Sequence, residues 1–117
     1  MCTYQHKNST RECRGDGYMW DADHDSYDPD DLSMPCPECN TEAYLLEAKE
    51  DAESCSHGSA NGYVYTGESI WLGAVRVAEA ANDPVAKAVL LKIGFVDALL
   101  PDASHADGFV TRTYVYK

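Results

Sequence analysis

Residues 34–41 read Met-Pro-Cys-Pro-Glu-Cys-Asn-Thr, which places Cys36 and Cys39 with two residues between them, directly before a segment of helical pattern. Two thiolates with this spacing, on a turn that proline keeps tight, can bind one side of a tetrahedral zinc ion. A structural role is favoured over a catalytic one, because closed cysteine-rich zinc sites commonly stabilise small domains. Cys36 and Cys39 are therefore predicted to be two ligands of a structural zinc ion.

The third predicted zinc ligand is Cys13. Residues 13–17 read Cys-Arg-Gly-Asp-Gly, and the two glycines allow a turn that directs the Cys13 thiolate toward the other two. The fourth ligand is open among Cys2, His6 and His24, with His6 or Cys2 preferred. The alternative interpretation is an isolated Cys-x-x-Cys pair that binds no metal.

A second candidate pair, Cys55 and His57, lies at the far end of the predicted helix. A helix over residues 41–54 is about 20 Å long at 1.5 Å per residue, which is far beyond the span of one coordination sphere. Cys55 is therefore not expected to share a metal ion with Cys36 and Cys39 unless the helix breaks.

The chain that follows the cysteines is predicted to be mainly helical. Helices are expected over residues 41–55, with a narrow apolar stripe, over residues 68–81, and from a restart at Asn82-Asp83-Pro84 to Ile93. Strands are expected over 63–65 and 109–116, a helical turn over 95–100, and a linker over 56–62. The predicted stripe is Leu45, Ala48, Ala52 and Cys55, and the other predicted core residues are Ile70, Trp71, Val75, Val77, Val85, Val89, Leu90, Ile93 and Phe95.

These elements predict an α+β fold in a single domain. A chain of 117 residues has the size of one domain. A small zinc-stapled N-terminal ribbon and the first helix are expected within residues 1–57. A mainly helical part with a short β-ribbon is expected over residues 63–117.

The negative charge is concentrated in the first half of the chain. The formal net charge is −11, and residues 1–60 hold 14 acidic and 4 basic residues, whereas residues 61–117 hold 6 and 5. Such a surface repels nucleic acid and anionic membranes, so direct binding to either is not expected. It attracts a strongly basic partner.

Seven acidic residues lie between Asp16 and Asp31 without one lysine or arginine. Such a run is either a solvated acidic face or a phosphate-like array offered to a basic partner. Aromatic residues beside it supply apolar anchors for an interface. The predicted partner-binding residues are Asp21, Asp23, Asp25, Asp28, Asp30, Asp31, Tyr18 and Trp20.

The sequence predicts a cytoplasmic protein. It shows no signal peptide and no apolar window of about 20 residues, the length of a membrane span. The five cysteines are an odd number, and a Cys-x-x-Cys pair in a reducing compartment indicates metal or redox use rather than a disulfide framework.

The segment from Cys13 to Tyr18, taken with residues 34–41, resembles the paired CxxCxGxG zinc motifs of DnaJ-type cysteine-rich domains. It is also similar to small bacteriophage proteins that carry such ribbons. The resemblance covers about residues 13–41; Thr10 stands where the pattern has its first cysteine, and residues 40–42 replace the second glycine run. It implies a zinc ribbon and an accessory or counter-defence role.

The functional hypothesis is a non-enzymatic acidic interaction protein. With the phage resemblance, its expected partner is the basic groove of a host nucleic-acid-binding complex, such as a CRISPR effector, a restriction enzyme or a polymerase. It would inhibit that complex as an anti-CRISPR-like mimic of nucleic acid. The alternatives are a DnaJ-like or virion-assembly adaptor, and a small zinc or thiol enzyme that uses the Cys36–Cys39 motif. No catalytic residue is predicted.

Overall fold

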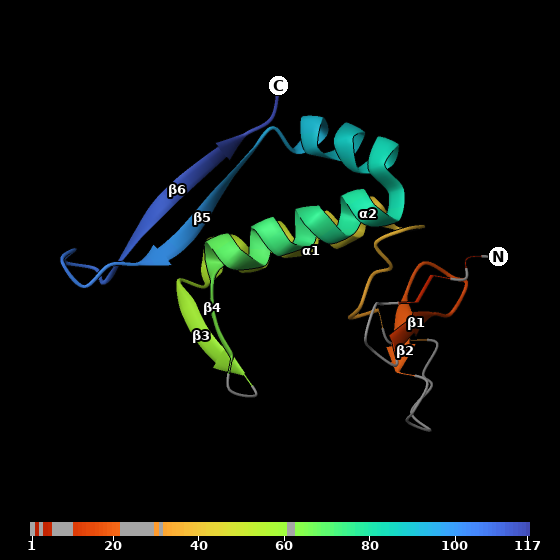
Figure 1. Cartoon of the computed structure of the whole chain (residues 1–117), viewed down its shortest axis with the longest axis horizontal. Helices are drawn as coiled ribbons and strands as arrows, with labels where there is room; N and C mark the ends of the chain where they lie inside the picture. Colours follow the sequence, from red (N-terminus) through yellow and green to blue (C-terminus); the bar gives the residue numbers. More distant parts are fainter. Residues whose placement is uncertain (1, 3, 6–10, 22–29, 31, 61–62) are drawn as a thin grey trace.

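Two packed helices form the centre of the computed structural model (Figure 1). The structure describes residues 2, 4–5, 11–21, 30, 32–60 and 63–117. Helix α1 spans Thr41–Ser54, and helix α2 spans Gly67–Ile93. The strands are β1 (Arg11–Cys13), β2 (Met19–Asp21), β3 (His57–Ala60), β4 (Tyr63–Thr66), β5 (Phe95–Pro101) and β6 (Phe109–Val115). They pair consecutively as three antiparallel two-stranded sheets, which confirms the α+β class.

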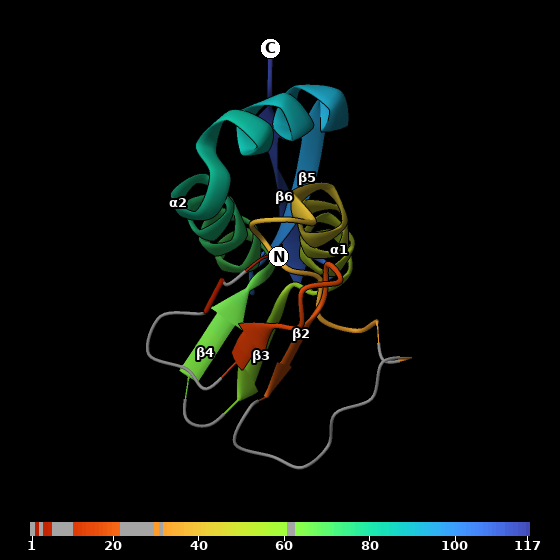
Figure 2. The same cartoon turned by 90° about the vertical axis from the view of Figure 1, so that its right-hand side faces the viewer.

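The three sheets take different positions around the helices. Strand β5 packs against both α1 and α2, so the β5–β6 sheet contributes to the core. The β1–β2 and β3–β4 sheets lie on one side of the helix pair, as two separate extensions (Figures 1 and 2). None of the helices in the described part of the chain is both long and apolar enough to span a membrane.

Helix α1 follows the predicted stripe. Leu45, Ala48 and Ala52 are buried, and the helix ends one residue before the half-buried Cys55. These positions are three or four residues apart and therefore lie on the face that contacts α2.

Helix α2 is two helical segments joined at a kink. Thr66 and Ser69 form a capping box at its start, and Asn82 has non-helical φ and ψ angles of −160° and 78°. The predicted restart at Asn82-Asp83-Pro84 is thus confirmed. Asn82 is the residue that leaves the helix, and the Asp83 carboxylate accepts a hydrogen bond from Lys87 Nζ. Gly94, at a φ of 83°, ends the helix as predicted.

The core is centred on Trp71, which is fully buried. Its indole Nε1 donates a 2.7 Å hydrogen bond to the Tyr116 hydroxyl, so the polar atom of the ring keeps a partner inside the protein. Two of the predicted core residues are instead exposed: Val85 at 43% and Phe95 at 50%. Val96 and Ala98 of β5 are buried in the core, which explains why Phe95 points outward, since neighbouring strand residues face opposite sides.

Residues 95–100 form a strand, so the expected helical turn there is wrong. Val96 and Ala98 alternate inward and pair with residues of β6, and this pairing satisfies the backbone of both strands. The expected linker over residues 56–62 is also wrong, because its residues 57–60 form β3. Gly58 lies opposite Tyr65 in the β3–β4 register, and a Cβ at Gly58 would come within 2.5 Å of the Tyr65 hydroxyl oxygen. The small residues therefore make room for an aromatic ring across the hairpin.

Replacing Gly67 with alanine is expected to destabilise the protein by about 1–3 kcal/mol, the range of overpacked cores. A Cβ there would clash with the backbone oxygen of Ala52 and come within 2.6 Å of the Cys55 carbonyl oxygen and 2.8 Å of the Leu99 nitrogen. The measurement is urea denaturation. Gly73→Ala is the matched control, because its Cβ meets nothing within 4 Å, and helix propensity predicts a gain of about 1 kcal/mol. Equal unfolding midpoints for both variants would contradict the close packing at Gly67.

Acid is expected to weaken the contact between β6 and the start of α2. The Tyr114 hydroxyl donates to the Glu68 carboxylate and, together with Arg112, holds the pKa of Glu68 below its ordinary value of 4.5. A lowered folded-state pKa stabilises the protein above the unfolded value, and this stabilisation is lost as the pH falls through the folded value. An NMR titration of Glu68 should give a midpoint below 4.5, which Tyr114→Phe moves upward. An unchanged midpoint in that variant would rule out the contact.

Candidate metal centre

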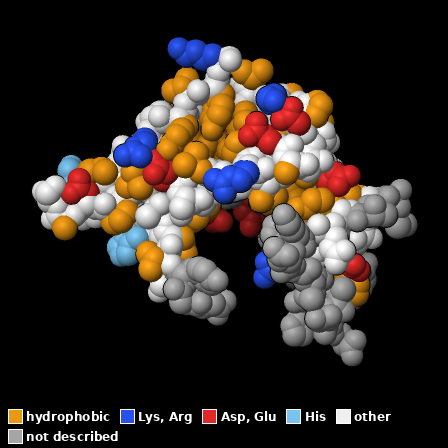
Figure 3. All heavy atoms as spheres, viewed as in Figure 1, with side chains coloured by type: hydrophobic (Ala, Val, Ile, Leu, Met, Phe, Trp, Pro, Cys, Tyr) orange, Lys and Arg blue, Asp and Glu red, His pale blue; other side chains and the backbone are white. Residues whose placement is uncertain are grey.

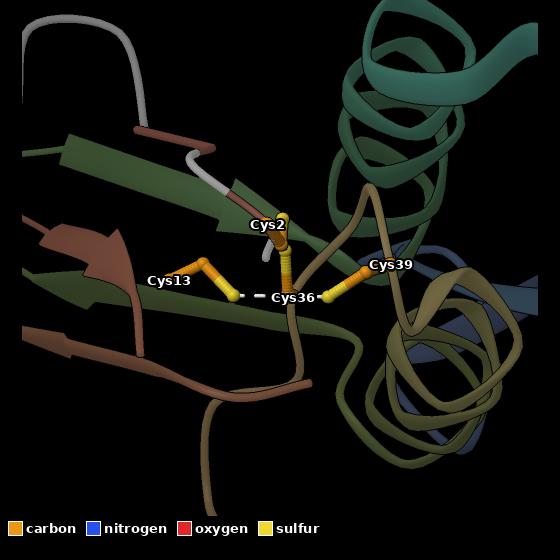
Figure 4. A group of neighbouring side chains, drawn as sticks. All are labelled: Cys2, Cys13, Cys36 and Cys39. Carbon is orange, nitrogen blue, oxygen red and sulfur yellow. Dashed lines mark hydrogen bonds between the residues drawn. The ribbon is translucent and has the colours of Figure 1, made fainter. Parts of the chain in front are cut away.

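Four cysteine side chains from three separate segments meet beside the start of α1 (Figure 4). They are Cys2, Cys13, Cys36 and Cys39, and their sulfur atoms all lie within 4.8 Å of one another. The Cys2 and Cys36 sulfurs are 3.8 Å apart, and those of Cys13 and Cys39 are 3.7 Å apart. All five cysteines of the chain are free thiols.

These distances fit a tetrahedral metal site. With a metal–sulfur bond of about 2.3 Å, as for zinc, the edge of a regular sulfur tetrahedron is about 3.8 Å. The Cys2–Cys36 and Cys13–Cys39 pairs share no residue, so they correspond to two opposite edges of such a tetrahedron. The remaining four edges lie below 4.8 Å. The cluster is therefore a four-cysteine site of the size that a metal ion requires.

The turn between β1 and β2 directs Cys13 toward the site. Gly15 and Gly17 both have a φ of 95°, a conformation that glycine adopts without steric cost. The Gly15 N–H donates a 3.3 Å hydrogen bond to the Cys13 sulfur, and the Gly17 carbonyl accepts a 2.9 Å bond from the Cys36 N–H. The turn thus contacts two of the four cysteines, and the predicted role of its glycines is confirmed.

The start of α1 holds the second part of the site. The Thr41 hydroxyl donates a 2.7 Å hydrogen bond to the Pro37 carbonyl, and the Asn40 N–H donates to the Cys36 carbonyl at 3.0 Å. The Asn40 side-chain amide also donates to the Gly17 carbonyl at 3.0 Å. Asn40 therefore links the β1–β2 turn to the Cys36–Cys39 turn.

The thiols strongly influence one another. Burial raises the pKa of Cys36 to about 11, and burial together with the other three thiols raises the pKa of Cys39. Burial acts in the same direction at Cys13, but the Gly15 N–H and the neighbouring thiols outweigh it and lower the Cys13 pKa. Four thiolates this close repel one another, and a divalent cation is the group that would offset their charge.

The structure brings together the predicted ligands Cys13, Cys36 and Cys39. Cys2, one of the alternatives for the fourth position, completes the set, whereas His6 and His24 lie outside the described residues. Nothing in the spacing of Cys2 marks it as a ligand, since ten residues of the chain lie between it and Cys13. The only sequence feature that could have indicated Cys2 as a ligand is that it is a cysteine.

Cys55 lies apart from the cluster, as predicted. Helix α1 is unbroken, and Cys55 follows its C-terminal end, whereas the cluster lies at its N-terminal end. There the Cys55 thiol donates a 3.4 Å hydrogen bond to the His57 carbonyl. The length of α1 therefore separates the fifth cysteine from the other four.

The predicted partner-binding residues are only partly described. Asp23, Asp25, Asp28 and Asp31 lie outside the described residues, and only the backbone of Asp21, in β2, is described. Asp30 is exposed, while Tyr18 and Trp20 are half-buried in and beside β2. The Arg14 guanidinium lies 5.7 Å from the centre of the Tyr18 ring, so this aromatic side chain contacts a cation of its own chain.

Substituting Cys2 with serine is expected to weaken metal binding as strongly as substituting Cys13, because each removes one of four sulfur ligands. Cobalt(II) is a suitable probe, since a tetrahedral thiolate site gives it strong visible absorption. We expect one cobalt ion per chain in the native protein, and loss of the tetrahedral spectrum in both variants. Cys55→Ser is the control and should keep the native spectrum. A native spectrum in Cys2→Ser would remove Cys2 from the ligand set.

Comparison with known proteins adds no further assignment to this site. No family model matches the chain, and no match was found among curated proteins or solved structures. The metal centre therefore rests on the geometry of the four cysteines.

Proposed function

We propose that this chain is a non-enzymatic acidic protein-binding module whose N-terminal half is held in shape by a structural zinc ion. The four-sulfur cluster carries the proposal, because it joins three segments that share little apolar core. Zinc fits a closed set of four cysteine ligands, which leaves no coordination position for a substrate. All four clustered thiols are then used for binding the metal, and none is left as a nucleophile.

The distribution of charge supports a basic partner. Residues 1–60, which contain the whole cluster, hold 14 acidic and 4 basic residues. A zinc ion at the cluster would fix the segments that it joins, and a preorganised surface binds a partner with a lower entropic cost than a disordered one. The partner class that combines a large basic surface with cytoplasmic abundance is the nucleic-acid-binding protein complex.

The specific hypothesis is inhibition of a host nucleic-acid-binding defence or polymerase complex, as an anti-CRISPR-like mimic of nucleic acid. Its support is the charge together with the resemblance to phage zinc ribbons. Binding of this kind blocks a phosphate-tracking groove without catalysis. It weakens as salt increases, because screening reduces attraction between exposed charges.

The structural role of zinc predicts a selective pattern of thiol alkylation. In the zinc-loaded native protein, iodoacetamide should modify Cys55 alone, since the other four thiols bind the metal. With a chelator, all five should react, as measured by mass spectrometry. Rapid alkylation of Cys36 or Cys39 in the zinc-loaded protein would favour a thiol enzyme instead.

Removing a zinc ligand is also expected to destabilise the N-terminal half. Cys36→Ser or Cys39→Ser should lower the hydrogen-exchange protection of residues 10–55 far more than Cys55→Ser, because metal-binding free energy contributes to folding. Similar losses of protection in all three variants would contradict the structural role of the site.

The partner hypothesis is tested by capture from bacterial lysate with matched charge variants. Asp23→Asn, Asp25→Asn and Asp28→Asn together change the net charge from −11 to −8, as do Glu79→Gln, Asp83→Asn and Asp107→Asn. We expect nucleic-acid-binding complexes to be retained at low salt, released at about 0.5 M NaCl, and lost only with the first variant. Salt-insensitive capture, or equal loss with both variants, would overturn the hypothesis.

A further inference from the structure

The face of the molecule beneath the helices is hollowed between the β1–β2 and β3–β4 sheets, and acidic side chains are visible in the hollow (Figure 3). The larger cavity there has a volume of about 440 Å³, within the range of ligand-binding sites. A second cavity of about 430 Å³ shares Asp51 and Ile70 with the first and extends to Tyr65 of β4. The two cavities are therefore neighbours, one beside the cysteine-rich ribbon and one beside the β3–β4 hairpin, and together they are called the groove below.

The floor and one wall of this groove are apolar. Ile70, Ala74 and Val77 of α2 contribute to the floor, and Met19, Pro35 and Pro37 form the wall beside the metal centre. Gly73 lies in the floor, and a Cβ added there would meet nothing within 4 Å. The absence of a side chain at Gly73 therefore leaves space on the groove side of α2.

Two acidic residues of α1 lie on the opposite rim of the groove, while Arg11 of β1 also lines the cavity. Glu47 and Asp51 lie four residues apart on α1, so both side chains project from the same face of the helix. Burial raises the pKa of Glu47, and the nearby negative charges of Asp51 and Glu50 raise it further. Among the described residues, no hydrogen bond or ion pair to the side chain of Glu47 or Asp51 is present. A cation bound between them would relieve the repulsion.

We propose that this groove binds an extended segment of the basic partner, with a lysine or arginine side chain held by Glu47 and Asp51. The inference deepens the proposed function and rests on it. The long aliphatic part of such a side chain would pack on the apolar floor, while its charged end reaches the carboxylates at the rim.

The metal centre contributes to this groove directly. Pro35 and Pro37 flank the metal ligand Cys36, and Met19 is bound through its backbone N–H to the Met34 carbonyl at 2.7 Å. The position of this wall relative to the helices therefore depends on where the cysteine-rich ribbon lies.

The test uses fluorescence anisotropy with the zinc-loaded full chain and labelled octapeptides. The probe alternates leucine and arginine, and its two comparison peptides alternate serine with arginine and leucine with glutamate. We expect the leucine–arginine peptide to bind best, because its leucine side chains add apolar contacts on the floor and its arginine side chains supply the positive charge. Equal binding of the serine–arginine peptide, which keeps the arginine side chains, would overturn a contribution of leucine side chains packed on the apolar floor.

Two groove variants and their matched controls locate the binding site. Glu47→Gln with Asp51→Asn, and separately Gly73→Leu, should each weaken peptide binding at least about tenfold. Glu79→Gln with Asp107→Asn removes the same charge elsewhere, and Ala80→Leu adds the same side chain at an exposed position of α2. Both controls should bind as the native protein does.

The failures of the two proposals are distinguishable. If the leucine–arginine peptide binds the native chain but the groove variants bind it equally well, the groove inference is wrong and the proposed binding of basic partners stands. If neither arginine peptide binds even at low salt, both proposals fail.

Discussion

The N-terminal half of this protein depends on the meeting of four thiols from three segments. In the described part of residues 1–40, the buried apolar residues are Met19, Pro35, Cys36 and Pro37, whereas the larger core cluster comes from the helices and β5. So little apolar burial does not offset the conformational entropy of an ordered ribbon. A metal ion held by the four cysteines would add folding free energy here, because its ligands come together only in the folded chain.

The helical half is stabilised in a different way. Trp71 is surrounded by small buried residues of both helices and by β5, and its indole is hydrogen-bonded to Tyr116 near the end of the chain. Gly67 permits the backbones of α1, α2 and β5 to approach one another closely. The two halves meet where Asn82, at the kink of α2, donates a 3.2 Å hydrogen bond to the Glu38 carbonyl within the Cys36–Cys39 turn. A break in α2 thus contacts the metal centre.

Charge and shape are combined in one region of the molecule. Glu47 and Asp51 of α1 line the groove that the cysteine-rich ribbon closes on one side, so the location of the ribbon decides whether these two carboxylates lie on an open surface or at the rim of a groove. A basic partner would then contact apolar surface as well as charge. This combination supplies affinity and selectivity beyond the screened attraction between exposed charges.

The sequence by itself determined the local features whose physical causes lie within a few residues. The helix from Thr41, its apolar stripe, the restart before Pro84 and the stop at Gly94 follow from periodicity, capping and glycine conformation. The Cys36–Cys39 pair and the turn glycines after Cys13 were also recognisable, and the length of α1 separated Cys55 from them. Only the tertiary structure decided which contacts form over long separations. It placed Cys2 at the fourth position, paired residues 57–60 and 95–101 as strands, exposed Phe95 and formed the groove below α1. Each of these depends on the partner that a residue meets in space, and that partner is not encoded in the neighbouring sequence.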